Sequence, residues 1–161
     1  MNDCYKSGVI QILSKRKYVP DLTRQMAICD ANYARIMKLM PHIDQDDVRE
    51  FRVRVSSSVA YVRLRVVERF TYTATLEVSQ ESRRSLNWLE SPSLVVRLYH
   101  DAQMAEVICM KRRKQLSGVY PYPNREMHHP DEKIQLNDFL GEWLSHCLEY
   151  GEEMEPVYNL D

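Results

Sequence analysis

Apolar residues in the first part of the chain recur with the period of an α-helix. Between residues 21 and 40 they are spaced alternately by four and three positions, which places them on one side of a helix. This stripe consists of Leu22, Met26, Cys29, Tyr33, Ile36 and Met40. Asp21 is a suitable N-cap residue, and Pro41 is incompatible with a continuing helix. The pattern therefore predicts a helix from Asp21 to Met40.

After residue 50 the period changes to two. Residues 51–55, 60–66 and 72–78 alternate apolar with polar side chains, and two further apolar runs follow at 94–99 and 103–110. Such alternation predicts strands with one buried and one exposed side. Most links between them are too short for a parallel crossover, so we expect antiparallel hairpins. In the third strand the side assigned to the core consists of Tyr72, Ala74, Leu76 and Val78.

A second helix is predicted from Pro130, because proline suits the first helical position and Asp131 and Glu132 place acids in the first turn. Gly151 is expected to cap its C-terminus. The apolar side comprises Leu136, Phe139, Leu140, Trp143, Leu144, Cys147 and Leu148. The predicted fold class is α+β: an antiparallel sheet of about five strands with the N-terminal and C-terminal helices packed on one face. We assign residues 17–161 to this single domain and residues 1–16 to an N-terminal extension.

Composition limits the cellular compartments and the cofactors that we expect for this protein. The formal net charge is −1, so bulk electrostatics favour neither nucleic acid nor a basic partner. The four cysteines have no metal-site spacing, which favours reduced thiols. No apolar run reaches the ~20 residues that span a bilayer, and no signal-peptide pattern is present. We expect a cytoplasmic protein with no membrane partner. The four glycines are far apart, so we expect no nucleotide-binding loop and no cofactor.

Several stretches are similar to a known bacterial family. "RLYHDAQMAEV", the "YPYPN" loop, "DEK", and a closing helix with the pattern "FL..WL..CL" followed by "PVY" resemble the YqiB-like family. The resemblance runs from about Lys17 to Tyr158. It implies a small cytoplasmic bacterial protein. That family is a domain of unknown function, so the resemblance assigns no activity and no catalytic residue.

Arginines gather on the polar side of the predicted strands, with tyrosines among them. They are Arg52, Arg54, Arg63, Arg65 and Arg97, accompanied by Tyr61 and Tyr99. Guanidinium groups bind carboxylate or phosphate through paired hydrogen bonds. Three interpretations stay open: a solvated face paired with Glu68, Glu77 and Glu106, a surface covered by the acidic segment 126–161, or a binding surface. Aromatics among arginines are also typical of single-strand nucleic-acid binding, which the near-zero net charge disfavours.

A second group of polar residues suggests chemistry. His100 and Asp101 lie in a predicted turn, and His128, Asp131 and Glu132 lie at the start of the last helix. Together they offer an acid-base pair for hydrolysis, and His100, Asp101, His128 and Glu132 offer ligands for a metal. The spacing matches no established signature such as HExxH or GxSxG. Turns and helix starts also favour acids for structural reasons.

The sequence therefore predicts a non-catalytic binding or regulatory module whose arginine- and tyrosine-rich sheet face takes another protein or a small anionic ligand. The alternative is a small hydrolase or metal-dependent enzyme built on the histidine and acid residues. RNA or single-stranded nucleic-acid binding is a further alternative. Oligomeric state is not determined by any of these patterns.

Overall fold

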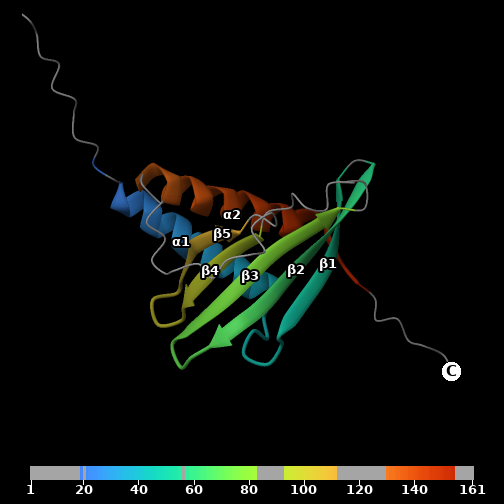
Figure 1. Ribbon diagram of the computed structural model, residues 1–161, viewed down its shortest axis with the longest axis horizontal. Helices are drawn as coiled ribbons and strands as arrows, with labels where there is room; N and C mark the ends of the chain where they lie inside the picture. The colour runs from blue at the N-terminus through green and yellow to red at the C-terminus, as the bar shows by residue number, and fades with distance from the viewer. Residues whose placement is uncertain (1–18, 20, 56, 83–92, 112–129, 155–161) are drawn as a thin grey trace, which may run out of the picture.

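The chain forms two helices and a six-stranded sheet in the part that the structure describes. This computed structural model describes residue 19 and residues 21–55, 57–82, 93–111 and 130–154. Figure 1 shows both helices on the same side of the sheet. The elements in chain order are α1 (Leu22–Leu39), β1 (Val48–Val55), β2 (Ser58–Arg69), β3 (Thr73–Ser82), β4 (Ser93–Tyr99), β5 (Met104–Lys111), α2 (Pro130–Tyr150) and β6 (Gly151–Glu153).

The sheet is an antiparallel meander with one added strand. Its order is β5-β4-β3-β2-β1-β6, so the first five strands lie beside their neighbours in the chain. The α+β class and the antiparallel pairing agree with the sequence. The expected count of about five strands was one too low, because β6 pairs with the edge of β1 through Phe51 and Glu153. The three residues of β6 do not alternate apolar with polar side chains, so the sequence does not predict a strand there.

Gly151 has a different role from the predicted helix cap. No described glycine has a positive φ, so Gly151 does not end α2 in the left-handed conformation. It begins β6 instead, opposite Val53. A Cβ atom at this position would lie 2.3 Å from the carbonyl oxygen of Cys147. Glycine is therefore required by the close approach of two backbone segments as the chain leaves the helix for the sheet edge.

The core lies between the sheet and the helices. The alternating residues of β1 to β5 supply the sheet side, including the fully buried Leu64, Leu76 and Leu98. The helices supply the other side, including Ile36, Met40, Leu140 and Leu144. Asp21 caps α1 as predicted, because its side chain accepts a hydrogen bond from the Arg24 amide at 3.0 Å.

Five residues assigned to the apolar sides from their spacing are exposed: Leu22, Met26, Tyr72, Phe139 and Leu148. Leu22 and Met26 continue the buried stripe of α1, but the core reaches that stripe only from Cys29 onward. Figure 1 shows the start of α1 extending past the ends of the strands. Tyr72 precedes β3 and lies in the turn between β2 and β3. Leu22, Met26 and Tyr72 lie at the ends of elements, where periodicity continues but the neighbouring layer does not. Phe139 and Leu148 instead lie at the two edges of the apolar side of α2, where the core covers them only in part.

A buried polar network joins α2, α1 and the edge strand β5. The Asn137 Oδ1 atom accepts a hydrogen bond from the Val107 backbone amide at 2.9 Å. The Asn32 Nδ2 atom donates to the Asn137 carbonyl oxygen at 2.8 Å. Both asparagine residues have 0% relative exposure. The network satisfies an edge-strand amide that β4 does not reach, and it sets the position of both helices against β5.

Two of the cysteines lie in the core, as their positions on the apolar helix sides indicate. Cys29 and Cys147 are buried free thiols. Burial raises the pKa of Cys29 to about 11, with the charge of Glu106 adding to the effect, and burial raises the pKa of Cys147 to about 12. Cys109 is partly exposed. Neither described helix is long and apolar enough to cross a membrane.

Candidate functional site: the outer face of the sheet

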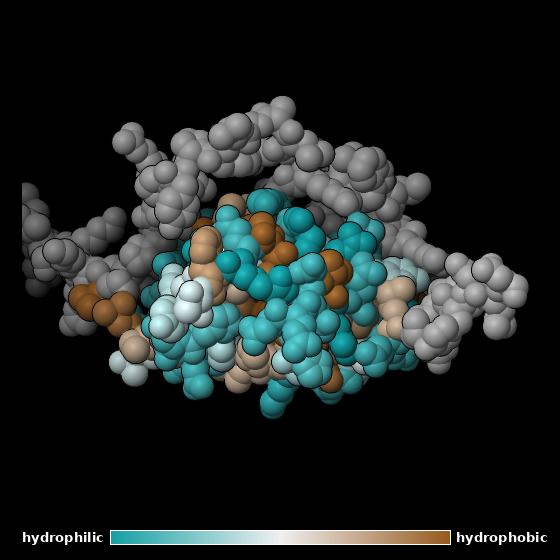
Figure 2. Space-filling model, turned by 90° about the horizontal axis from the view of Figure 1, so that it is seen from below, coloured by the Kyte–Doolittle hydropathy of each residue, from teal (hydrophilic) through white to brown (hydrophobic). Residues whose placement is uncertain are grey.

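The sheet surface turned away from the helices, here called the outer face, carries the predicted arginines and tyrosines. Strand register places Arg52, Arg54, Arg63, Arg65, Arg97, Tyr61 and Tyr99 on it. Acids occupy neighbouring positions, so this face is not uniformly basic. Its described cations are those five arginines and Lys111, and its described acids are Glu50, Glu68, Glu77, Glu81, Glu106 and Glu152. In Figure 2 the surface seen from below is mainly hydrophilic, with hydrophobic residues in small separate areas.

Two arginines of β1 share one carboxylate on β6. The Arg52 Nε and Nη2 atoms lie 3.1 and 2.5 Å from Glu152 Oε2. The Arg54 Nη2 atom lies 3.9 Å from the same oxygen, beyond hydrogen-bonding distance. The hydrogen bond from Arg52, followed by the charges of Arg52 and Arg54, lowers the pKa of Glu152. Among the described residues at this corner of the face, two guanidinium groups therefore share one carboxylate.

The middle of the outer face is a ladder of opposite charges on adjacent strands. Arg63 pairs with Glu50, and Arg65 pairs with Glu77. Burial alone would raise the pKa of Glu77, but hydrogen bonds from Arg65 and Ser93 and the charge of Lys111 outweigh it and lower the pKa. Cross-strand pairs of this kind hold the side chains in position, while each exposed pair stabilises the fold by only ~0–1 kcal/mol.

Arg97 is less well satisfied than Arg52, Arg63 and Arg65. Its Nη2 atom lies 4.0 Å from Glu68 Oε2, and its buried Nε atom has no hydrogen-bond partner among the described residues. Glu106 is directly opposite Arg97 in the register but forms its ion pair with Lys133 of α2. Glu68 and Glu77 are therefore partners of the arginines, as predicted, whereas Glu106 pairs with Lys133 instead.

A small hollow lies on the outer face beside Tyr61. It has a volume of about 140 Å³ and is lined by Glu50, Tyr61, Val62, Arg63, Ser79, Glu81 and Met154. This is below the ~300–1,000 Å³ of typical small-molecule sites. The carboxylates of Glu50 and Glu81 on its wall oppose a bound anion. The geometry is better suited to contact with a partner's surface than to enclosing a small ligand.

The histidine and acid residues predicted as a catalytic or metal site are only partly described. His100 and Asp101 lie in the turn between β4 and β5, and Glu132 is exposed in the first turn of α2. His128 and the side chain of Asp131 lie outside the described residues. The His100 Nδ1 atom is 3.0 Å from the Tyr33 hydroxyl oxygen, and the two rings meet edge to face. Among the described residues no three His, Cys, Asp or Glu side chains are grouped to hold a metal.

A groove between the two helices was not indicated by the sequence. It has a volume of about 580 Å³ and an inner surface of small residues that includes Ala27, Ala31, Gly141 and Ser145. A Cβ atom at Gly141 would lie 2.9 Å from Asn32 Oδ1, so glycine permits the helices to approach here. Charged side chains of both signs border the groove, among them Arg35 and Glu142. In a sequence, small residues on one face of a helix indicate only that the helix packs against a neighbour. For this reason the sequence does not predict the groove.

The comparisons with known proteins identify the family of this chain. A family model described as "Protein of unknown function (DUF1249)" matches residues 35–153, which cover α1 from its last turns through β6. The chain belongs to the DUF1249 family. Relatives named YqiB confirm the resemblance seen in its motifs.

Curated relatives of this DUF1249 chain are uncharacterised as well. The chain is 36% identical to "Uncharacterized protein YqiB" of Escherichia coli K12 over 143 residues, which is 89% of this chain and 99% of the relative. The proteins of the same name from Escherichia coli O6:H1 and O157:H7 match to the same extent. No solved structure matches. The family membership therefore carries neither a known structure nor an activity to this chain.

Proposed function

We propose that this DUF1249 chain is a non-catalytic binding module whose outer sheet face recognises an acidic surface of a partner protein. The observation that carries the proposal is the pair Arg52 and Arg54, which share the single carboxylate of Glu152. The side chain of Arg54 is 60% exposed and lies beyond hydrogen-bonding distance of that carboxylate. Among the described residues Arg54 donates no hydrogen bond, so a partner carboxylate can occupy this position without displacing one of theirs.

The rest of the face suits the same role. Tyr61 lies directly opposite Arg52 on β2, and Arg63 and Arg65 follow on the same strand. Glu50, the partner of Arg63, has a 39% exposed side chain, so exchanging it for a carboxylate of a partner protein costs little. Arginine and tyrosine are the residues most enriched at protein interfaces. Arg97 and Tyr99 belong to the same face and extend it toward β5.

Protein is favoured over the other ligand classes on physical grounds. The described cations and acids of the face are equal in number, which opposes the phosphate contacts that dominate nucleic-acid affinity. The hollow beside Tyr61 is small and has acidic walls, so it does not suit a small anion. An extended array with alternating charge instead fits a protein surface of complementary pattern.

Site-specific photo-crosslinking in bacterial cells tests the proposal. Tyr61 is replaced by p-benzoylphenylalanine in the full chain, and Phe139, an exposed aromatic residue of α2, is replaced in a matched control. We expect a discrete protein adduct from position 61, none from position 139, and loss of the adduct when Arg52→Glu and Arg54→Glu are added. Failure to form an adduct at position 61, a nuclease-sensitive adduct, or an adduct indifferent to the two arginines would refute it.

A further inference from the structure

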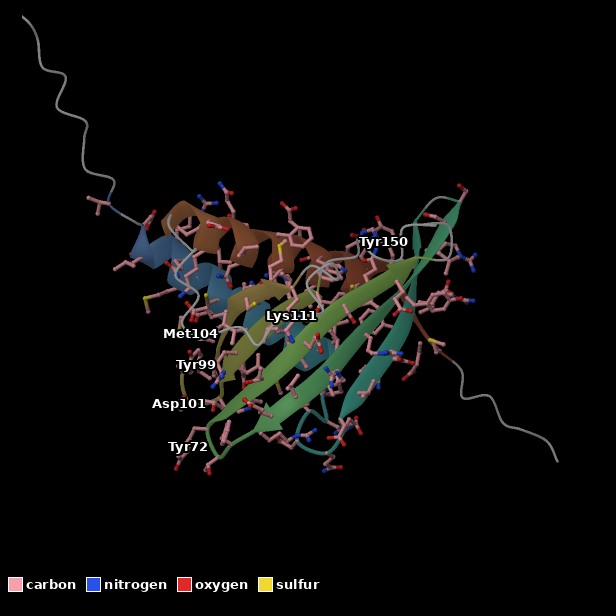
Figure 3. The ribbon with its side chains drawn as sticks, in the orientation of Figure 1. Tyr72, Tyr99, Asp101, Met104, Lys111 and Tyr150 are labelled. Carbon is pink, nitrogen blue, oxygen red and sulfur yellow. The ribbon has the colours of Figure 1, made fainter. Side chains whose placement is uncertain are left out.

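Two aromatic side chains are exposed at one end of the sheet. Phe70 and Tyr72 have 61% and 66% relative exposure and flank the turn between β2 and β3. Phe70 is the residue that directly follows β2. Across the sheet, Thr73, Tyr99 and Met104 form the row next to it. Figure 3 shows Tyr72, Tyr99, Asp101 and Met104 at this same end of the sheet.

Hydrogen bonds hold this end of the sheet in one conformation. The Phe70 amide donates to the Thr73 carbonyl at 2.7 Å and closes the turn between β2 and β3. The His100 amide donates to the Tyr72 carbonyl at 2.8 Å, which ties that turn to the one between β4 and β5. The His100 ring contacts Tyr33 on α1. Exposed aromatics on a preorganised support lose little entropy when they bind.

A third loop is attached to the same place through Arg69. The Arg69 Nε atom donates to the Ile43 carbonyl at 3.1 Å, and its Nη2 atom donates to the Asp46 carbonyl at 2.6 Å. Its Nη1 atom pairs with the Asp47 carboxylate at 2.5 Å. The loop between α1 and β1 therefore lies against the residue that precedes Phe70. We call the three connected segments, residues 40–47, 68–73 and 99–104, the loop end.

The loop end is strongly acidic. Its three segments contain one arginine, Arg69, and five acids, Asp44, Asp46, Asp47, Glu68 and Asp101. Asp44, Asp46 and Asp101 make no ion pair with a described residue, and the charge of Asp44 adds to burial in raising the pKa of Tyr33. Arg97 lies one row further along the sheet. The chemistry is the reverse of the Arg52 and Arg54 corner, so this surface selects a different partner.

We propose that the loop end is a second interaction surface, which binds a partner segment carrying lysine or arginine beside apolar side chains. The aromatic faces of Phe70 and Tyr72 attract a desolvated cation as well as an apolar side chain. The free carboxylates of Asp44 and Asp101 provide the complementary charge. The same negative charge opposes contact with anionic lipid, which otherwise attracts exposed aromatic hairpin tips. A basic protein segment is the occupant that satisfies both features.

A peptide selection tests the chemistry without knowledge of the natural partner. The full chain is immobilised and panned against phage-displayed random peptides, and binding of the most enriched peptide is measured by fluorescence anisotropy. We expect enriched peptides to combine Lys or Arg with apolar residues. The double variant Phe70→Ser, Tyr72→Ser should weaken the peptide by about tenfold or more. Tyr150→Ser, which removes an exposed tyrosine elsewhere, should leave the affinity unchanged.

A second variant that changes charge, and a measurement of self-association of the chain, keep the test conclusive. Asp44→Asn, Asp101→Asn retains both aromatics and should weaken the peptide while reducing the salt dependence of binding. If circular dichroism shows that the Phe70→Ser, Tyr72→Ser variant has lost its fold, the Asp44→Asn, Asp101→Asn variant is the test in its place. Selection of acidic peptides, no enrichment, affinity unaffected by the charge variant, or self-association that requires Tyr72 would each overturn the proposal. Because Arg52 and Arg54 are unchanged throughout, failure here is separate from failure at the outer face.

Discussion

The replacement of Asn137 by leucine should destabilise the fold out of proportion to the size of the change. Leucine has a similar volume and suits the surrounding core, but it removes the acceptor of the Val107 amide, which is 2.9 Å from Asn137 Oδ1. That amide belongs to the edge strand β5, and the helix covers it from water. Leaving a buried donor without a partner costs ~1–3 kcal/mol. The side-chain hydrogen bond to the Lys133 carbonyl is lost as well.

Urea unfolding of Asn137→Leu and wild type measures the effect. We expect the free energy of unfolding to fall by ~1–3 kcal/mol, which corresponds to a fall in Tm of about 2–4 °C for each kcal/mol in a domain of this size. Gln135→Leu makes the same chemical change at an exposed position of α2 and should stay within about 0.5 kcal/mol of wild type. Hydrogen exchange should show Val107 losing protection more than the central strands.

The reasoning would be refuted by an Asn137→Leu protein as stable as wild type. Such a result would mean that the added apolar burial offsets the unsatisfied amide, or that β5 moves to expose the amide to water. Hydrogen exchange separates these two cases, because only movement of β5 increases exchange at Val107 without a loss of global stability.

Three further predictions concern single residues. Because the folded-state pKa of Glu77 lies below its ordinary value of 4.5, the stability margin of wild type over Glu77→Gln should be complete above pH 4.5 and shrink as the pH falls through the folded-state pKa. Urea titrations across that range check it, and a margin that grows on acidification contradicts it. Gly151→Ala should lower the free energy of unfolding by ~1–3 kcal/mol, since its Cβ would lie 2.3 Å from the Cys147 carbonyl oxygen; unchanged thermal stability would exclude that clash. Native iodoacetamide labelling with peptide mass spectrometry should modify Cys109 and spare Cys29 and Cys147 until denaturant is added, because both are buried with pKa values of about 11 and 12. Equal labelling of the three would contradict the burial.

The two proposed surfaces give the chain an unusual division of charge for a protein with a formal net charge of −1. The corner at Arg52 and Arg54 has more guanidinium groups than carboxylates, whereas the loop end has five acids and one arginine. Both sets are carried by the same rigid sheet. Under the two proposals the chain would contact two partners of opposite charge, and the two variant sets described above separate those contacts experimentally.

The local pattern of apolar and polar residues predicted the helices and strands correctly wherever a segment is long enough to repeat its period. The alternation in β2 and β3 identified the buried residues Val62, Leu64, Leu76 and Val78. Asp21 and Pro130 marked the starts of both helices. The prediction failed at positions where burial depends on the neighbouring layer, as at Leu22 and Tyr72, and at β6, whose three residues become a strand only because the edge of β1 is available.

By itself the sequence determined the α+β class, the antiparallel hairpins, the two helices and the outward direction of the arginines. All of these depend on periods and caps that act within a few residues of one another. The tertiary structure alone decided which acid meets each arginine, since Glu152 reaches Arg52 from a hundred residues away and Glu106 leaves Arg97 for Lys133. It alone brought three loops together around Phe70 and Tyr72. Those arrangements follow from how the layers pack, which no local pattern encodes.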